Sequence, residues 1–118
     1  MLPKLENLKH TNGKNFFLIA GPCVVESEEM TFKIAESVKA ICDQLEIPLI
    51  FKASYRKANR TRSDSFKGIG DEVSLNILKS VKEKLALPVL TDIHESKDAS
   101  LAAKYVDVLQ IPAFLCRQ

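Results

Sequence analysis

The sequence predicts an α/β fold in which short parallel strands alternate with amphipathic helices. Short apolar runs recur along the 118 residues, and segments of helical periodicity separate them. Polar residues follow each apolar run at the point where a strand would end. Neither a GxGxxG nor a Walker-type loop follows the first run, which argues against an open nucleotide-binding sheet.

The first unit is predicted to be a strand over residues 15–20 and a helix over residues 28–45. The strand-like run stops at Gly21-Pro22 and is apolar enough for a strand buried on both faces. Ser27 is a suitable N-cap, and acidic residues in the first turn suit the helix dipole. The predicted apolar stripe of this helix consists of Met30, Ile34, Val38, Ile41 and Leu45.

Three further units follow. A second strand begins at Leu49, and a long polar loop over residues 52–70 leads to a helix that Asp71 is expected to cap. A third strand begins at Pro88 and runs to residue 94, Ser96 is expected to cap a short helix to residue 104, and the fourth strand covers residues 106–111. The predicted stripe of the second helix consists of Val73, Ile77, Leu78, Val81 and Leu85.

A (β/α)8 barrel explains the polar strand ends better than an open doubly wound sheet. All strand ends of a barrel converge on one active-site face, whereas an open sheet binds its ligand mainly at the switch point. A complete barrel has eight units and ~250 residues. We therefore expect residues 1–118 to supply the first four units of one barrel domain, with residues 1–14 as an N-terminal extension. We also expect the chain to be a piece of a longer polypeptide.

Composition excludes several classes of protein. A formal net charge of +2 gives no reason to expect a nucleic-acid or membrane partner. No apolar run approaches the ~20 residues that cross a bilayer, and the polar N-terminus lacks the apolar core of a signal peptide. Three widely spaced cysteines without a CxxC pair argue against a disulfide framework or a self-contained zinc site. A cytoplasmic setting is the simplest expectation.

The loop after the second strand is the densest functional feature. Residues 52–70 contain six Lys or Arg side chains, which match phosphate and carboxylate groups. A solvated charged loop or a nucleic-acid patch remains an alternative. Lys52 directly follows the apolar strand, so we expect it to be partly buried and to need an anionic partner or a shifted pKa.

Other candidate residues lie at the remaining strand ends. Asp92 and His94 are two positions apart, so strand alternation directs both to the mouth, where His94 could transfer protons. Capping of the next helix is the competing explanation. Gln110, Pro112 and Phe114 share one face in the same way, with Gln110 supplying an amide and Phe114 excluding water, although ordinary packing would also explain them. Arg117 is a further candidate anion ligand.

Cys23 follows Gly21-Pro22 and could be a metal thiolate, a nucleophile or a small buried residue. The residues alone favour the buried reading, which is the commonest fate of a free cysteine. Cys42 and Cys116 stand beside apolar residues and are predicted to be structural.

Four motifs resemble the 3-deoxy-D-manno-octulosonate 8-phosphate synthases, also called 2-dehydro-3-deoxyphosphooctonate aldolases. The resemblance runs from about residue 15 onward. The motifs occupy residues 20–27, residues 51–54 with Lys57-Ala58-Asn59-Arg60, residues 91–95 and residues 110–118. The resemblance implies a (β/α)8 barrel that condenses phosphoenolpyruvate with arabinose 5-phosphate, for lipopolysaccharide synthesis, and releases phosphate. It also implies a homotetramer.

Site roles are implied by the same motifs. Lys52 and Lys57 would hold phosphoenolpyruvate, and Asn59 and Arg60 would hold arabinose 5-phosphate. Lys57, Asp92 and His94 are the candidate catalytic residues. The pocket would also contain Ser54, Gln110, Ala113, Phe114 and Arg117.

Metal dependence is implied by Cys23, because metal-independent members of the family have Asn at that position. The divalent ion would take its remaining His, Glu and Asp ligands from outside this chain, which alone is expected to be inactive. Two alternatives stay open. One is a phosphoheptonate aldolase, which uses erythrose 4-phosphate and typically has a Lys-Pro-Arg-Thr signature after the second strand. The other is a non-catalytic half-barrel.

Overall fold

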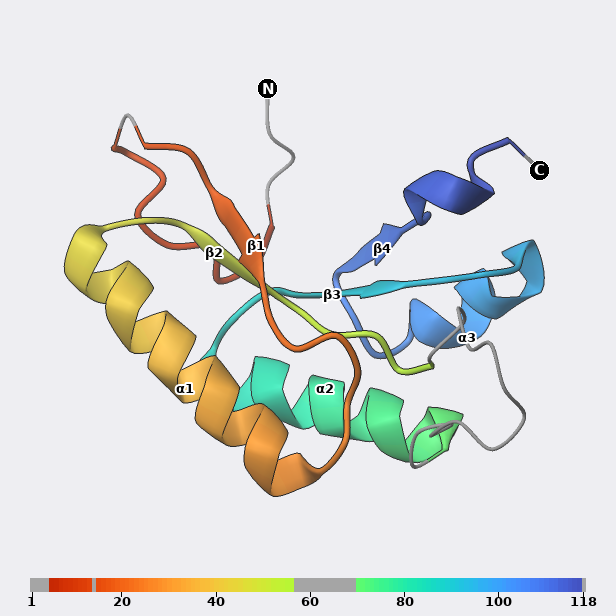
Figure 1. Ribbon diagram of the computed structural model, residues 1–118. Helices are drawn as coiled ribbons and strands as arrows, with labels where there is room; N and C mark the ends of the chain where they lie inside the picture. Colours follow the sequence, from red (N-terminus) through yellow and green to blue (C-terminus); the bar gives the residue numbers. More distant parts are fainter. Residues whose placement is uncertain (1–4, 14, 57–69, 118) are drawn as a thin grey trace.

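A four-stranded parallel sheet forms the centre of the computed structural model, which describes residues 5–13, 15–56 and 70–117 (Figure 1). The strands are β1 (Leu18–Ala20), β2 (Leu49–Lys52), β3 (Val89–Asp92) and β4 (Val108–Gln110), and they pair in sequence order. Every pairing is parallel. The sheet therefore confirms the predicted β/α repeat, and its order is that of four successive units of a (β/α)8 barrel.

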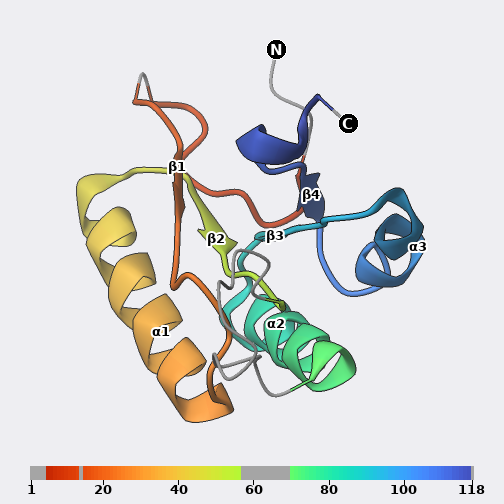
Figure 2. The same ribbon diagram turned by 45° about the vertical axis from the view of Figure 1, so that its right-hand side comes forward.

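The two long helices, α1 (Glu28–Leu45) and α2 (Asp71–Leu85), cover one face of this sheet (Figures 1 and 2). Helix α3 (Ala99–Ala102) follows the 3-10 turn η1 (Ser96–Asp98), and a second 3-10 turn, η2 (Ala113–Leu115), follows β4. None of the described helices is both long and apolar enough to cross a lipid bilayer.

Strand alternation divides the sheet residues between its two faces. Leu18, Leu49, Phe51 and Val89 pack into the core that α1 and α2 cover. The alternate residues face the other way, and an apolar cavity of about 200 Å³ lies on that side. Its walls come from the sheet and from the N-terminal segment, residues 5–13: Leu5, Leu8, Phe17, Ile19, Ile50, Leu90 and Val108. The N-terminal segment therefore packs on the face that the helices leave open.

Two contacts attach the N-terminal segment to the ends of the long helices. Lys9 donates to the carbonyl of Ala86, just past the end of α2, at 2.8 Å. His10 Nε2 lies 2.9 Å from Asp43 Oδ1 near the end of α1. Lys39 also pairs with this carboxylate, and together these partners lower the pKa of Asp43.

The predicted buried faces were partly wrong. The first strand was expected to be buried on both faces, but Ile19 of β1 is 42% exposed because it lies on the face away from the helices, whereas β2 and β3 are mostly buried. Ile34 and Val38 of α1 pack on the core, whereas Met30, Ile41 and Leu45 are exposed because the face toward the sheet is centred on Thr31, Ala35 and Cys42. In α2, Val73 is exposed, and the buried stripe includes Ser74 and Leu75 as well as the predicted Ile77, Leu78 and Val81.

Helix starts also differ from expectation. Ser27 caps α1 as predicted, accepting the Met30 N–H at 3.1 Å. At α2 the N-cap is Gly70, whose φ of 106° suits a residue without a Cβ atom, and Asp71 is the first helical residue. Glu95 rather than Ser96 caps η1, because it has the extended backbone that an N-cap needs. The predicted helix to residue 104 and strand over residues 106–111 are both shorter.

The backbone at Gly21 lies so close to the backbone at Lys52 that only glycine fits at position 21. A Cβ atom at this position would lie 1.6 Å from the Lys52 carbonyl oxygen and 2.7 Å from its carbon. The pairing of the two segments continues beyond β1 and β2, since Val25 donates to the Ser54 carbonyl at 2.9 Å and Ser54 donates to the Cys23 carbonyl at 3.3 Å. Glycine therefore lets the chain after β1 lie directly on the chain after β2.

We predict that Gly21→Ala lowers the free energy of unfolding by at least about 2–3 kcal/mol, because backbone atoms must move to admit the methyl group. Gly13→Ala is the matched control, since its Cβ would meet nothing closer than 3.7 Å. Chemical denaturation of the two variants measures the difference. Equal stabilities would contradict the close approach.

Candidate functional site

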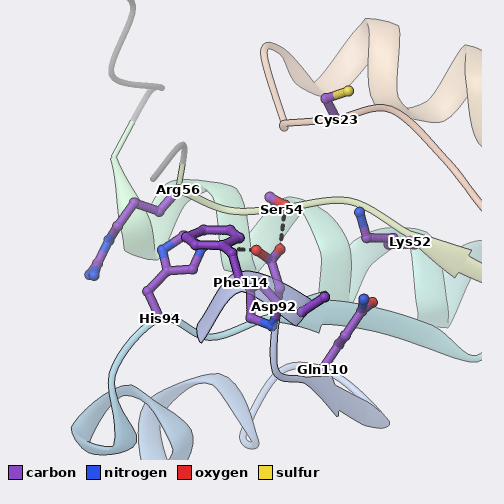
Figure 3. Close-up of a pocket in the computed structure, with 10 residues that line it drawn as sticks. Cys23, Lys52, Ser54, Arg56, Asp92, His94, Gln110 and Phe114 are labelled. Carbon is purple, nitrogen blue, oxygen red and sulfur yellow. Dashed lines mark hydrogen bonds and ion pairs between the residues drawn. The ribbon is translucent and has the colours of Figure 1, made fainter. Parts of the chain in front are cut away.

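A cavity of about 380 Å³ opens at the carboxyl ends of the strands. Figure 3 shows the residues that line it, which come from the last residues of β2, β3 and β4 and from the segments that follow the four strands. Eight residues predicted from the sequence meet there: Cys23, Lys52, Ser54, Asp92, His94, Gln110, Ala113 and Phe114. Arg56 and Pro112 complete the lining. The predicted convergence of strand ends on one mouth is therefore observed.

Strand register explains why three of these side chains share the cavity. Asp92 pairs in register with Gln110, and Lys52 pairs with Leu90, two residues before Asp92. Because side chains two positions apart point to the same face, Lys52, Asp92 and Gln110 continue the face of Ile50, Leu90 and Val108. Along β2, β3 and β4, this face of the sheet thus changes from an apolar to a polar side chain between one residue and the next residue on the same face.

Asp92 is the centre of the polar contacts. Ser54 Oγ donates to Asp92 Oδ1, and His94 Nε2 lies 2.8 Å from Asp92 Oδ2 (Figure 3). An ionised carboxylate only accepts hydrogen bonds, so Nε2 of His94 carries the hydrogen. In the neutral ring, Nδ1 then keeps a lone pair that can accept a proton. Alternation was expected to direct both residues to the mouth, and both reach it, although His94 lies beyond the end of β3.

Lys52 is the last residue of β2 and is half-buried, as predicted. Among the residues that the structure describes, no carboxylate lies within ion-pair distance of the Lys52 ammonium. Lys52 therefore adds positive charge to the cavity. A compact cation at this position suits a phosphate or carboxylate of a ligand.

The segment after β4 closes one side of the cavity differently from expectation. Strand pairing ends at Gln110, so the expected strand alternation does not extend to Pro112 and Phe114; the turn η2 nevertheless brings Pro112, Ala113 and Phe114 to the wall. The Phe114 ring is 66% exposed in this chain.

Cys116, predicted to be structural, is exposed, and Arg117 is exposed outside the cavity lining. Cys42 is buried as predicted, and burial raises the pKa of its thiol.

Arg56 departs from the expectation that the loop cations are all available to anions. Its guanidinium pairs with Asp71 at the start of α2, and its Nη1 lies 3.3 Å from Asp98 Oδ2 in η1. It also lies 5.4 Å from the centroid of the Tyr55 ring. The hydrogen bond to Asp71 raises its pKa above the ordinary value. No spacing in the sequence marks these partners, which lie 15 and 42 residues away.

Part of the predicted anion site lies outside the described residues. Lys57, Asn59 and Arg60 fall in the segment 57–69, so the structure says nothing of their positions.

Cys23 has an exposed side chain on the cavity wall, so the buried position that the residues alone favoured, before the family resemblance was considered, was wrong. Figure 3 shows its sulfur on the loop after β1, apart from Asp92 and His94. Within the described part of the chain, no three Cys, His, Asp or Glu side chains are grouped to hold a metal ion. An accessible thiol fits the chemistry of a divalent-metal ligand, but it supplies one donor of the set.

Comparison with known proteins gives a consistent result. The family model described as "DAHP synthetase I family" matches residues 3–118. A Cyanothece sp. protein named 2-dehydro-3-deoxyphosphooctonate aldolase is 58% identical over 91% of this chain and 39% of its own length. Proteins of the same name from Trichlorobacter lovleyi and Burkholderia multivorans are 54% and 57% identical, over 95% and 89% of this chain and 41% and 37% of their own lengths. The chain thus spans about two fifths of the curated relatives that it matches.

We predict that Tyr55 ionises above its ordinary pKa of 10.0, because burial and then the charge of Asp98 disfavour the phenolate. Because the pKa of Tyr55 is higher in the folded state than in the unfolded state, its protonated side chain stabilises the fold fully below pH 10. This stabilisation is lost as the pH rises through the folded-state pKa of Tyr55. An absorbance titration should show a tyrosine that ionises above pH 10. Tyr55→Phe should remove this step and reduce the alkaline loss of stability; if the step remained in Tyr55→Phe, the assignment would be contradicted.

Proposed function

Because the chain belongs to the DAHP synthetase I family, we propose that it forms part of an enzyme that condenses phosphoenolpyruvate with D-arabinose 5-phosphate. The products are 3-deoxy-D-manno-octulosonate 8-phosphate and phosphate. The observation that carries the proposal is the single cavity at the strand ends, which gathers Lys52, Asp92, His94 and Gln110. The names of the relatives, all 2-dehydro-3-deoxyphosphooctonate aldolases, support this product.

The reaction forms one carbon–carbon bond and releases phosphate. The enol carbon of phosphoenolpyruvate attacks the sugar aldehyde, whose oxygen takes up a proton. Water adds to the cationic carbon that results and gives up a proton, and phosphate leaves from that carbon. Fixed cations and dipoles suit this chemistry because both substrates are anionic and charge moves during the reaction.

The predicted site residues that line the cavity take the following parts in this proposal. Lys52 holds an anionic group of phosphoenolpyruvate, in line with its half-buried position at the end of β2. Nδ1 of His94 accepts or returns a proton, while Asp92 holds the ring through Nε2. Ser54 and Gln110 orient bound hydroxyl or carboxylate groups, and Ala113 and Phe114 form the wall of the cavity.

Residues 57–60 complete the substrate site in this proposal. Lys57 binds phosphoenolpyruvate and takes part in catalysis, while Asn59 and Arg60 bind arabinose 5-phosphate, with Arg60 at its phosphate. Arg117 adds positive charge near the mouth. These roles rest on the motif resemblance and on the placement of the neighbouring Lys52 and Ser54 in the cavity.

We also propose that the enzyme depends on a divalent metal ion held in part by Cys23. The exposed thiol on the cavity wall supports this assignment. When bound, the ion would supply positive charge that polarises substrate oxygen atoms. A role in lipopolysaccharide synthesis in the cytoplasm and a homotetrameric assembly complete the proposal. These rest on the same family resemblance.

Phosphoheptonate aldolase activity is the nearest alternative, and the description of the matching family admits it. Two observations disfavour it: the Lys-Ala-Asn-Arg sequence at residues 57–60 and the shared name of the relatives. A non-catalytic half-barrel is the other alternative. The polar side chains that line the cavity at the strand ends do not support it.

We predict that a chimera in which this chain replaces the matching part of the Burkholderia multivorans relative condenses phosphoenolpyruvate with arabinose 5-phosphate. Its rate with erythrose 4-phosphate should be lower by tenfold or more, a difference of at least about 1.4 kcal/mol. Phosphate release measures both rates. In the same chimera, Lys52→Gln should weaken phosphoenolpyruvate binding, whereas Lys33→Gln, an exposed control, should not. Preference for erythrose 4-phosphate would overturn the proposal.

We predict that removing metal with a strong chelator abolishes the activity of this chimera and that adding back a divalent ion restores it. Cys23→Ser should lower metal affinity and turnover, because a hydroxyl is a poorer ligand than a thiolate for ions of this type. Cys116→Ser is the matched control, since that thiol is exposed but lies outside the cavity lining. Full activity after chelation would rule out metal dependence.

A further inference from the structure

We propose that Arg56 and Asp98 are positioning residues for His94. They would hold the turn after β3 so that the imidazole keeps its contact with Asp92. The proposal rests on the proposed function only in taking His94 as a proton-transfer group. Its structural content concerns contacts between described residues at the edge of the cavity.

The first step is that Arg56 is committed to protein carboxylates. Its guanidinium contacts Asp71 and Asp98 and covers the ring of Tyr55, which is only 2% exposed. A guanidinium in that arrangement has few donors left for a substrate anion. Arg56 lines the cavity but acts on the protein, unlike Lys52.

The second step concerns Asp98, which is buried, with only 8% of its surface exposed. One of its oxygens, Oδ2, accepts both the Arg56 Nη1 at 3.3 Å and the backbone N–H of Glu95 at 3.3 Å. A buried carboxylate that loses its cation is strongly destabilising, so the Arg56 guanidinium holds the Asp98 side chain in place. The same carboxylate thereby caps the first turn of η1.

The third step links this cap to the imidazole. Glu95 is the residue directly after His94, so the cap fixes the backbone on the C-terminal side of His94. On its other side, Asp92 is the last residue of β3 and is held by pairing with Gln110. His94 therefore lies in a short segment that is held at Asp92 on one side and at Glu95 on the other. Figure 3 shows Arg56 and His94 on the same side of the cavity.

These contacts close a ring around the edge of the cavity. Ser54 binds Asp92, Asp92 binds His94, the residue after His94 binds Asp98, and Asp98 binds Arg56, two residues after Ser54. The ring joins the ends of β2 and β3 to η1. We infer that weakening the Arg56–Asp98 pair loosens His94 from Asp92 and mixes its two neutral tautomers.

The test is nitrogen NMR of the histidine rings in the 118-residue chain, together with hydrogen exchange of the Glu95 amide. His10→Gln assigns the two histidines. The unmodified chain should show the Nε2–H tautomer of His94 in the neutral ring. Arg56→Gln and Asp98→Ala should both mix the tautomers, and Asp98→Ala should speed exchange of the Glu95 amide by about fivefold to tenfold, the loss of one hydrogen bond.

Two further variants separate positioning from a general structural role. Asp98→Asn keeps an oxygen for the Glu95 N–H and should restore most of the amide protection, and it also carries the test if Asp98→Ala does not fold. Asp71→Asn removes the other partner of Arg56 without touching η1, so it should leave the His94 spectrum unchanged. The proposal is overturned if Arg56→Gln leaves the tautomer unmixed or if Asp71→Asn mixes it equally. Because no substrate is used, failure of the enzymatic proposal would not affect this result.

Discussion

The alternation of side chains along parallel strands is the constraint on which the rest of this structure depends. Each strand has one row of side chains against α1 and α2 and another on the opposite face. In β2 and β3 the second row changes from an apolar to a polar residue at the strand end, from Ile50 to Lys52 and from Leu90 to Asp92. Hydrophobic burial fixes the register, and the register then fixes where the polar groups lie. The site is therefore positioned by the same interaction that forms the core.

Charge in the site is divided between groups that bind the protein and groups that remain available. Arg56 is satisfied by Asp71 and Asp98, and Asp92 is satisfied by Ser54 and His94. Lys52 is left beside this network with its charge directed to the cavity. Both substrates of the proposed reaction are anionic, and a cation already bound to a carboxylate would contribute little to binding them.

Local sequence patterns predicted the elements well because each depends on nearby residues. The cap at Ser27, the core residues Ile77, Leu78 and Val81, and the convergence of Lys52, Asp92 and Gln110 all follow from periodicity and strand ends. Long-range contacts were not predictable in this way. The partners of Arg56 lie far away in sequence, and the packing direction of α1 depends on where the sheet lies relative to Thr31 and Ala35. The exposure of Cys23 likewise depends on how the chain after β1 lies on β2.

The attachment of the N-terminal segment has a consequence for the order of folding. Its two anchors join residues that are 33 and 77 positions apart, and each accepting group lies at or just past the C-terminal end of a long helix. Closing such loops costs chain entropy before any contact repays it. The acceptors come together only when α1 and α2 have formed and packed on the sheet. We infer that residues 5–13 dock after α1 and α2 have packed, although they precede both helices in the sequence.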